Sequence, residues 1–479
     1  MRGKRRCGWL SGVILFFLGL FLWGLPQGVQ AKSVNEQILE ILLNSKMVTP
    51  EKYQELKKQA EAEEAELQRL RALEKKVQEE KAPAGNAKVD FKKGFTMESA
   101  DGENKLKLSG RLHADYRWFL NDHPSNDTFL IRRARIAALG TFYKHYDFSV
   151  EYDMGEGNAR LNDAFMNIRY WPEAQLMFGQ YKVPFSLEEL HSDNWIDFIE
   201  RSLANNFAPS RDIGIMLHGN ISKDLLYYQL GVFNGRKLNT SDVDDQKDVA
   251  GRVTVAPFAR MDNKILKGLH IGGAFTTGSE HTTNPQADWW RYQYKTEGQT
   301  TFLQFNDTVA QDGTRNRLGA ELAWLMGPVS LKSEYMTLQL NDLTYNKKKA
   351  SFDDNTAGYV SLGWFLTGEE EPWRNGLPQQ ITPKKPFKLG KPGYCGAFQL
   401  VGRYEWIDMD DDILKLGFAD PKKYTDKASG YTLGLTWYPN DLLRFMVNYY
   451  YTKFDDAITV SGKKFDNEQG ILTRFEVVW

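Results

Sequence analysis

Arginine recurs at alternate positions in the segment Ile131-Arg132-Arg133-Ala134-Arg135. Residues two apart in a strand lie on the same face, so Arg133 and Arg135 share a face that Arg132 does not. Two guanidinium groups beside water attract anions and repel cations, which is the chemistry of an ion-selectivity element. An arginine that faces lipid near the middle of a membrane costs about 2–4 kcal/mol. If this strand crosses a membrane, Arg133 and Arg135 therefore face water, and Arg132 lies near an interface where its side chain reaches polar surroundings.

Segment 183–210 is of mixed charge and has basic residues at its borders. Three basic residues lie in or beside it: Lys182, Arg201 and Arg211. Five acidic residues also lie in it: Glu188, Glu189, Asp193, Asp197 and Glu200. For any single basic residue, an ion pair that stabilises the wall and the loop is the favoured interpretation. As a set beside water, the basic residues bias which ions enter.

The last strand indicates the element that must position these residues. Phe475, Val477 and Trp479 alternate with Glu476 and Val478, so one face of the strand is apolar and aromatic. A final strand that closes on an aromatic residue is typical of outer-membrane β-barrels, in which aromatic rings lie at the membrane interface.

The first 31 residues have the pattern of an export signal. Arg2, Lys4, Arg5 and Arg6 are basic, Ser11–Leu25 is an apolar run, and Val29-Gln30-Ala31 provides small residues for cleavage. The apolar run is short for a transmembrane helix, which needs about 20 residues. We therefore predict a signal peptide over residues 1–31. After its removal Cys395 is the single cysteine, so no internal disulfide is expected.

Composition favours a barrel over a bundle of membrane helices. No long apolar run follows Leu25 and the mean hydropathy is −0.52, yet 13% of residues are aromatic and 40 are glycine. Lipid-facing and lumen-facing residues alternate in a water-filled barrel, so no segment is hydrophobic as a whole. Residues 147–154 show this alternation, with one face polar and the other apolar. The net charge of −1 argues against nucleic-acid binding.

A helical segment is predicted before the barrel, over residues 32–82. Thr49 and Pro50 are suited to begin a helix as N-cap and first-turn residue. Eight positions then follow at alternating spacings of three and four: Tyr53, Leu56, Ala60, Glu63, Leu67, Leu70, Glu74 and Val77. Six are apolar, which favours a short coiled coil over a single solvated helix. Residues 83–103 are predicted as a linker, and residues 104–479 as the barrel.

Three segments resemble the phosphate-selective porin O and P family: 131–140 with its arginines, 178–190 with Gly-Gln-Tyr-Lys-Val-Pro-Phe, and 199–214 from Ile199-Glu200-Arg201-Ser202 to Arg211-Asp212-Ile213-Gly214. A weaker match lies at 396–404, and the likeness spans about 104–479. The resemblance implies a trimeric channel of sixteen strands in the outer membrane. Many members of the family also have a helical segment before the barrel.

In the light of that resemblance, about sixteen strands can be counted, an even number as in bacterial barrels. They lie near 104–120, 128–141, 145–154, 161–171, 174–182, 211–221, 225–235, 248–258, 268–277, 315–326, 328–340, 355–366, 396–409, 428–438, 443–454 and 470–479. Tight connections fall on one side, as at 171–174, 222–224, 327–328 and 438–441. Longer ones fall on the other: 183–210, 236–247, 278–314, 341–354, 410–427 and 455–469. The exception is 367–395, a long segment rich in Pro and Lys on the side of the short turns.

The count also places segment 183–210 after the fifth strand, where barrel channels commonly fold a loop inward to narrow the pore. We therefore predict that Arg133, Arg135, Lys182, Arg201 and Arg211 are the basic contribution to a constriction of mixed charge.

Catalytic signatures are missing from the sequence. It has no Gly-x-Ser-x-Gly elbow, no phosphate-binding Gly-x4-Gly-Lys-Ser/Thr loop, and no pair of histidines at zinc-ligand spacing. Asp408, Asp410 and Asp412 alternate as in a calcium loop, but Ile413 stands where such a loop needs glycine. We predict no enzyme activity, cofactor or metal site.

Together these features predict an outer-membrane porin, a passive channel for small hydrophilic solutes with a preference for anions such as phosphate. Its expected partners are those solutes, outer-membrane lipid and two further copies of the chain, not nucleic acid. The alternative is an adhesive or envelope-tethering protein that uses the barrel only as an anchor. A barrel enzyme is disfavoured by the missing Ser/His constellation.

Overall fold

The computed structural model describes residues 43–45, 48–80, 88–90, 95–120, 123–222, 225–236, 238–242, 244–281 and 292–479. The chain divides into two units, Met1–Pro83 and Ala84–Trp479. The predicted signal peptide lies outside the described residues.

The first unit contains helix α3, which spans Pro50–Glu80 and has 31 residues. Its start follows the prediction, because the Thr49 hydroxyl accepts a hydrogen bond from the backbone N–H of Lys52 at 3.3 Å. Leu67, Leu70 and Leu73 are each about half exposed. Among the described residues, no helix is both long and apolar enough to cross a membrane. The coiled coil stays a prediction, as a single chain cannot test it.

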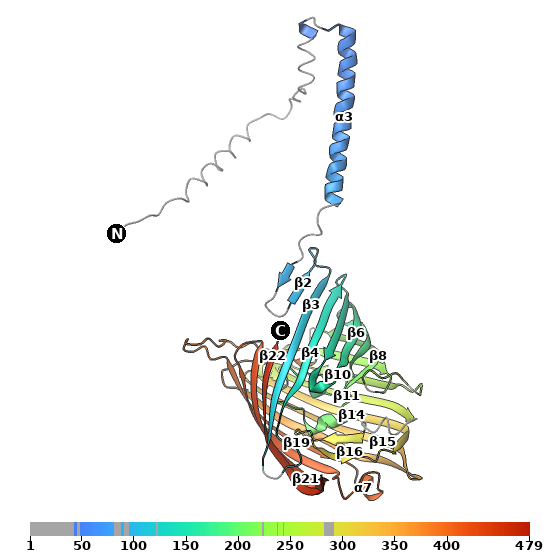
Figure 1. Ribbon diagram of the computed structural model, residues 1–479, viewed down its shortest axis with the longest axis vertical. Helices are drawn as coiled ribbons and strands as arrows, with labels where there is room; N and C mark the ends of the chain where they lie inside the picture. The colour runs from blue at the N-terminus through green and yellow to red at the C-terminus, as the bar shows by residue number, and fades with distance from the viewer. Residues whose placement is uncertain are drawn as a thin grey trace, which may run out of the picture. The chain divides into compact units, whose positions relative to one another are not determined.

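The second unit is a closed antiparallel barrel, in which each strand pairs with the next along the chain and β22 pairs with β3 (Figure 1). The predicted sixteen-strand ring is confirmed. Its strands are β3 (Lys105–Phe119), β4 (Thr128–Phe142), β5 (Tyr146–Asp153), β6 (Arg160–Trp171), β7 (Ala174–Lys182), β8 (Arg211–Ile221), β9 (Leu226–Phe233), β10 (Asp248–Val255), β11 (Leu269–His281), β14 (Ala310–Met326), β15 (Val329–Tyr345), β16 (Lys348–Phe365), β19 (Ala397–Asp408), β20 (Lys427–Tyr438), β21 (Leu443–Val460) and β22 (Lys463–Val478).

Alternation along each strand separates two environments. In β5, Val150 and Tyr152 are each 46% exposed, whereas Glu151 and Asp153 are buried. Apolar side chains therefore face outward and charged ones face the lumen, which is the reverse of a soluble domain. The buried core of this unit lies within the lumen, where aliphatic and aromatic side chains pack together beside buried charged groups.

We call the end of the barrel where β3 begins and β22 ends the terminal rim, and the opposite end the loop rim. The four short connections predicted on one side lie at the terminal rim.

Residues 341–354 and 455–469 were predicted as long loops, and this prediction was wrong, because most of each segment is strand. At the loop rim, β15 and β16 continue to a two-residue turn at Asn346-Lys347, and β21 and β22 to one at Ser461-Gly462. All four turn residues have positive φ, as type I′ hairpins require.

Three other segments carry additional strands. The loop at 282–309 contains a short hairpin of β12 (Gln293–Lys295) and β13 (Thr301–Gln304), and the segment after β16 contains β17 (Trp373–Arg374) and β18 (Leu377–Pro378). The region predicted as a linker, 83–103, contains β1 (Lys88–Asp90) and β2 (Phe95–Glu98), and β2 pairs with β3. The sheet therefore begins before residue 104.

Trp479 continues the pairing of β22 with β3. Its backbone N–H donates to the carbonyl of Gly110 at 3.1 Å, and the N–H of Gly110 donates to the carbonyl of Trp479 at the same distance. A Cβ on Gly110 would lie 2.2 Å from the indole ring. Glycine at 110 therefore leaves room for the ring against the strand where the barrel closes.

We expect Gly110→Ala to lower the yield of folded barrel in the outer membrane several-fold, because the methyl group displaces the Trp479 ring at a cost of about 1–3 kcal/mol. The measurement is the fraction of protein with heat-modifiable mobility. The control is Gly402→Ala, where the nearest side-chain atom would be 3.4 Å from the new methyl group. Equal yields from the two variants would show that the ring's position is not needed for closure.

Candidate functional site

The segment 183–210, which we call the inward loop, is folded into the lumen between β7 and β8. It contains α4 (Leu187–Leu190) and the short 3-10 helix η2 (Leu203–Phe207). Phe185, Ile199 and Ala204 are 2%, 1% and 0% exposed. The loop contacts residues on the lumen faces of β3, β4, β15, β19, β21 and β22, so it occupies the bore along that part of the wall.

Glu200 of the inward loop lies among three guanidinium groups. Its carboxylate is 3.0 Å from Arg117, 2.8 Å from Arg132 and 3.8 Å from Arg474. Burial alone would raise the pKa of the Glu200 carboxyl, but Arg132 and its neighbours hold it below the usual range. Glu200 is therefore an anionic anchor between the loop and the wall.

Arg132 takes part in this anchor because of a β-bulge. His113 pairs with Arg133 and Ala114 with Ile131, so Arg132 is an extra residue in β4. Its side chain turns inward to Glu200 and also reaches Glu156 at 3.0 Å. The prediction that Arg132 points to the face opposite Arg133 and Arg135 was wrong, because strict alternation fails at a bulge.

Asp193 forms a second anchor with the same wall. Arg133 lies 2.5 Å and Arg135 3.0 Å from its carboxylate, and Arg111 contacts it as well. Burial would raise the pKa of Asp193, but Arg135, Arg133 and Arg111 hold it well below its usual value. Arg133 and Arg135 therefore share the lumen face, as expected from their spacing.

Glu334 of β15 and Arg403 of β19 bind the first part of the inward loop. The Glu334 carboxylate of β15 accepts hydrogen bonds from the backbone N–H groups of Leu187 and Glu188 at 2.8 and 2.9 Å. Arg403 of β19 lies 2.9 Å from Glu188. It also contacts Glu297 and Glu405, and stacks over Phe198. Arg403 is therefore a single cation among three carboxylates, one from the inward loop, one from the loop at 282–309 and one from β19 itself.

Lys182 and Arg201 bind the carbonyl groups at the C-terminal end of α4. The ammonium group of Lys182 donates to the carbonyls of Glu189 and His191, and Arg201 donates to the carbonyls of Glu188, Glu189 and His191 at 3.0–3.2 Å. Cations at the carbonyl end of a helical turn stabilise it. The structure therefore places these two residues in the support of the loop.

Arg211 lies at the start of β8, 2.7 Å from Asp163 and 3.8 Å from Glu151. Glu151 also binds Arg135 at 3.1 Å. One carboxylate thus brings Arg135 and Arg211 together, whereas Lys182 and Arg201 form a separate group.

Several basic residues that contact the inward loop were missed from the sequence: Arg111, Arg117, Lys332, Arg403, Arg444 and Arg474. Lys332 lies 2.9 Å from Asp197, and Arg444 lies 2.7 Å from Glu476. Alternation was the available signal, since Arg111 and Arg117 share the lumen face of β3 with His113 and Asp115. Which of them meet the loop depended on its fold.

Two cavities lie on either side of the inward loop. The cavity toward the terminal rim is about 240 Å³, and its charged lining consists of Lys107, Arg111, Arg135 and Glu151. The cavity toward the loop rim is about 440 Å³, and its charged lining consists of Arg211, Arg236, Arg315, Arg317, Asp212 and Asp248. In each cavity basic groups outnumber acidic groups.

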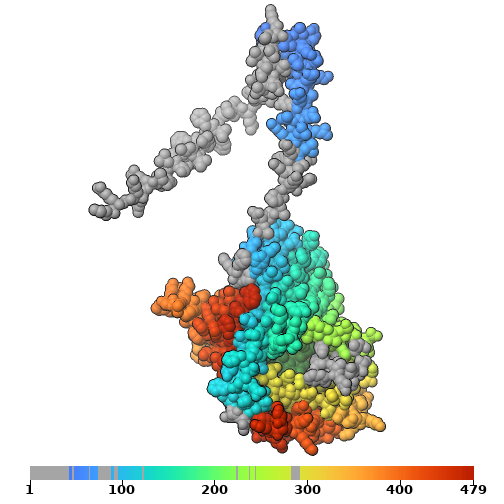
Figure 2. All heavy atoms as spheres, in the orientation of Figure 1, coloured from blue at the N-terminus to red at the C-terminus, as the bar shows by residue number. Residues whose placement is uncertain are grey.

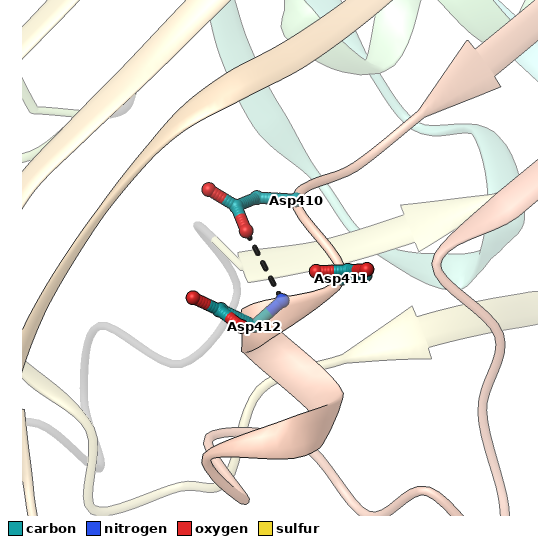
Figure 3. Close-up of side chains that lie close together, drawn as sticks. All are labelled: Asp410, Asp411 and Asp412. Carbon is teal, nitrogen blue, oxygen red and sulfur yellow. Dashed lines mark hydrogen bonds between the residues drawn. The ribbon is translucent and has the colours of Figure 1, made fainter.

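The acidic run at 410–412 has a local structural role at the loop rim. The three carboxylates gather at the start of α7 (Asp412–Lys415) (Figure 3). Asp410 accepts a hydrogen bond from the backbone N–H of Asp412 at 3.0 Å, and Asp411 pairs with Lys415 at 2.5 Å. These contacts account for two of the three groups without an ion.

The sequence is similar to a known protein family and to two known proteins. A family model described as phosphate-selective porin O and P matches residues 106–479. Porin O of Pseudomonas aeruginosa is 26% identical over 417 residues, which cover 82% of this chain and 92% of that protein. An uncharacterized protein of Caulobacter vibrioides is 24% identical over 374 residues, 73% of this chain and 68% of its own.

Solved structures share the barrel fold. An anion-selective porin from Comamonas acidovorans matches with a TM-score of 0.50 and 11% identity, over 79% of this chain and 100% of that one. OmpF of Salmonella typhi, in a complex with daunomycin, matches with a TM-score of 0.50 and 14% identity, over 79% and 98%.

Proposed function

The chain belongs to the phosphate-selective porin O and P family, a family of non-enzymatic outer-membrane channels, and on that premise we propose that it passes small hydrophilic solutes with a preference for anions such as phosphate. Transport is passive diffusion through a water-filled lumen that the inward loop narrows.

The observation that carries the anion preference is the charge of the two cavities. Both are lined by more basic than acidic groups, and the pairing of their arginines with Asp193 and Glu280 reduces this excess of positive charge before and after the inward loop. Fixed charges around a narrow bore act strongly on a passing ion, because they lie within the Debye length of about 8 Å at physiological salt.

The two loop anchors add to this preference. Asp193 and Glu200 each lie among three guanidinium groups, so neither carboxylate offers a free negative charge to the bore. The planar guanidinium fork also suits the oxygens of phosphate. The acidic groups around Arg403 work in the opposite direction, so the preference is expected to be moderate.

The experiment is a reversal potential across a planar bilayer under a KCl gradient, followed by addition of inorganic phosphate. We expect the sign of an anion-preferring channel and a reduction of the chloride current by phosphate. A cation-preferring or neutral potential would remove the anion proposal, and an unchanged chloride current would remove phosphate as a favoured solute.

Assembly as a homotrimer is part of the same proposal, with the half-exposed leucines of α3 as a candidate coiled-coil seam. The tethering alternative assigns the function to residues 33–81 instead. Deletion of 33–81 distinguishes the two, because a channel keeps its conductance without this segment and a tether loses its attachment.

A further inference from the structure

Residues 382–396 form a projection that the channel does not use. The chain leaves the lumen at Ile381, which is buried, and returns to the barrel wall at Ala397. Backbone hydrogen bonds close the projection at its base, from Gly396 to the carbonyl of Lys385 at 3.0 Å, and further out, from Lys388 to the carbonyl of Tyr394 at 3.0 Å. We call this segment the lysine finger. Figure 2 shows it as an orange projection from the side of the barrel.

The lysine finger is strongly basic and has an apolar tip. It contains Lys384, Lys385, Lys388 and Lys391, and residues 382–396 include no acidic residue. Leu389 at the tip is 91% exposed, which makes it the most exposed large apolar side chain among the described residues. Transfer of this side chain from water into an apolar phase is favourable.

The base of the finger is attached to the lipid-facing surface of the barrel. Phe387 packs edge-on against Trp437 at 5.3 Å between ring centroids, and the indole N–H of Trp437 donates to the carbonyl of Cys395 at 2.7 Å. Trp437 in turn stacks on Phe398 and Phe445, which belong to the outward faces of their strands. The finger therefore leaves the wall within an aromatic belt, where membrane barrels meet the headgroup region.

We propose that the lysine finger binds the anionic phospholipid headgroups of the leaflet at the terminal rim, with Leu389 inserted among the acyl chains. Short turns of outer-membrane barrels lie in the periplasm, so this is the periplasmic leaflet. Lysines beside an anionic surface, with an apolar residue that enters the acyl boundary, are the two components of interfacial binding. This binding does not depend on which solute the channel passes.

The first test compares two variants that lose the same charge. Lys385→Gln, Lys388→Gln and Lys391→Gln together alter the finger, and Lys347→Gln, Lys463→Gln and Lys464→Gln together alter exposed positions at the loop rim. The probe is dioleoyl phosphatidylglycerol, titrated into detergent-purified protein and detected by native mass spectrometry. We expect the apparent dissociation constant to rise roughly tenfold or more in the finger variant and to stay unchanged in the rim variant. Equal constants for wild type and finger variant would overturn the proposal.

The second test locates the tip and does not depend on lipid affinity. Leu389→Cys in a Cys395→Ser background gives a single labelling site after the predicted signal peptide. A fluorophore there is expected to be less accessible to the neutral quencher acrylamide in vesicles of equal phosphatidylcholine and phosphatidylglycerol than in vesicles of phosphatidylcholine alone. Equal accessibility in the two kinds of vesicle would overturn the proposal.

Discussion

Arg403→Met is expected to release the inward loop from its wall and to raise the single-channel conductance. The side chain of Arg403 is fully buried and contacts three carboxylates, on Glu188, Glu297 and Glu405. Removal of the shared cation leaves these carboxylates without the positive charge that they share, which costs about 3–5 kcal/mol. The loop can lower that cost by moving Glu188 toward water, and such a movement widens the bore.

Two measurements check this expectation: conductance at 1 M KCl, where charge effects are screened, and the temperature at which the heat-modifiable form is lost. Arg403→Met combined with Glu405→Gln serves as the control, because it removes one buried negative charge and should recover part of the stability. Wild-type conductance and wild-type thermal behaviour in the single variant would mean that Arg403 does not hold the loop.

The barrel was predictable because its chemistry repeats along every strand. Polar residues face a wet lumen and apolar residues face lipid, so segments such as 147–154 carry the signal locally. The signal fails where strands continue beyond the membrane. There the pairings of β15 with β16 and of β21 with β22 shift register, so strict alternation fails and residues 341–354 and 455–469 resemble loops.

The candidate site was predictable only in part. The spacing of Arg133 and Arg135 placed both in the lumen, but one extra residue in β4 moved Arg132 to the same side, and no pattern in the sequence marks the bulge. The partners of these arginines come from the inward loop. Arg474, for example, donates to the carbonyl of Ile199 at 2.8 Å, although 275 positions separate them. Such pairs follow from the closure of the ring and the path of the loop.

Neutralisation of Arg133 and Arg135 tests the predicted basic residues most directly. Both contact Asp193, and Arg135 also binds Asp153 at 2.8 Å. Replacement of both by glutamine leaves Arg111 as the remaining basic neighbour of Asp193. The wall beside the cavity toward the terminal rim thus becomes more negative by two charges. A unit charge 4 Å from an ion changes its energy by about 1–4 kcal/mol for effective dielectric constants between 80 and 20. We therefore expect the anion-to-cation permeability ratio to fall several-fold, or to invert.

The salt dependence separates this electrostatic effect from a displaced loop. The Debye length is about 30 Å at 0.01 M and about 3 Å at 1 M, so the change in reversal potential should be large at low salt and small at high salt. Conductance at 1 M should stay close to the wild type if the loop keeps its place. Addition of Asp193→Asn removes one uncompensated negative charge and should restore part of the ratio. Lys347→Gln with Lys464→Gln, at exposed positions of the loop rim, is the matched control for the loss of two positive charges. If the reversal potential at low salt is the same in the arginine variant and the wild type while the barrel is intact, Arg133 and Arg135 serve only to hold Asp193. The channel would then be a general porin of weak selectivity.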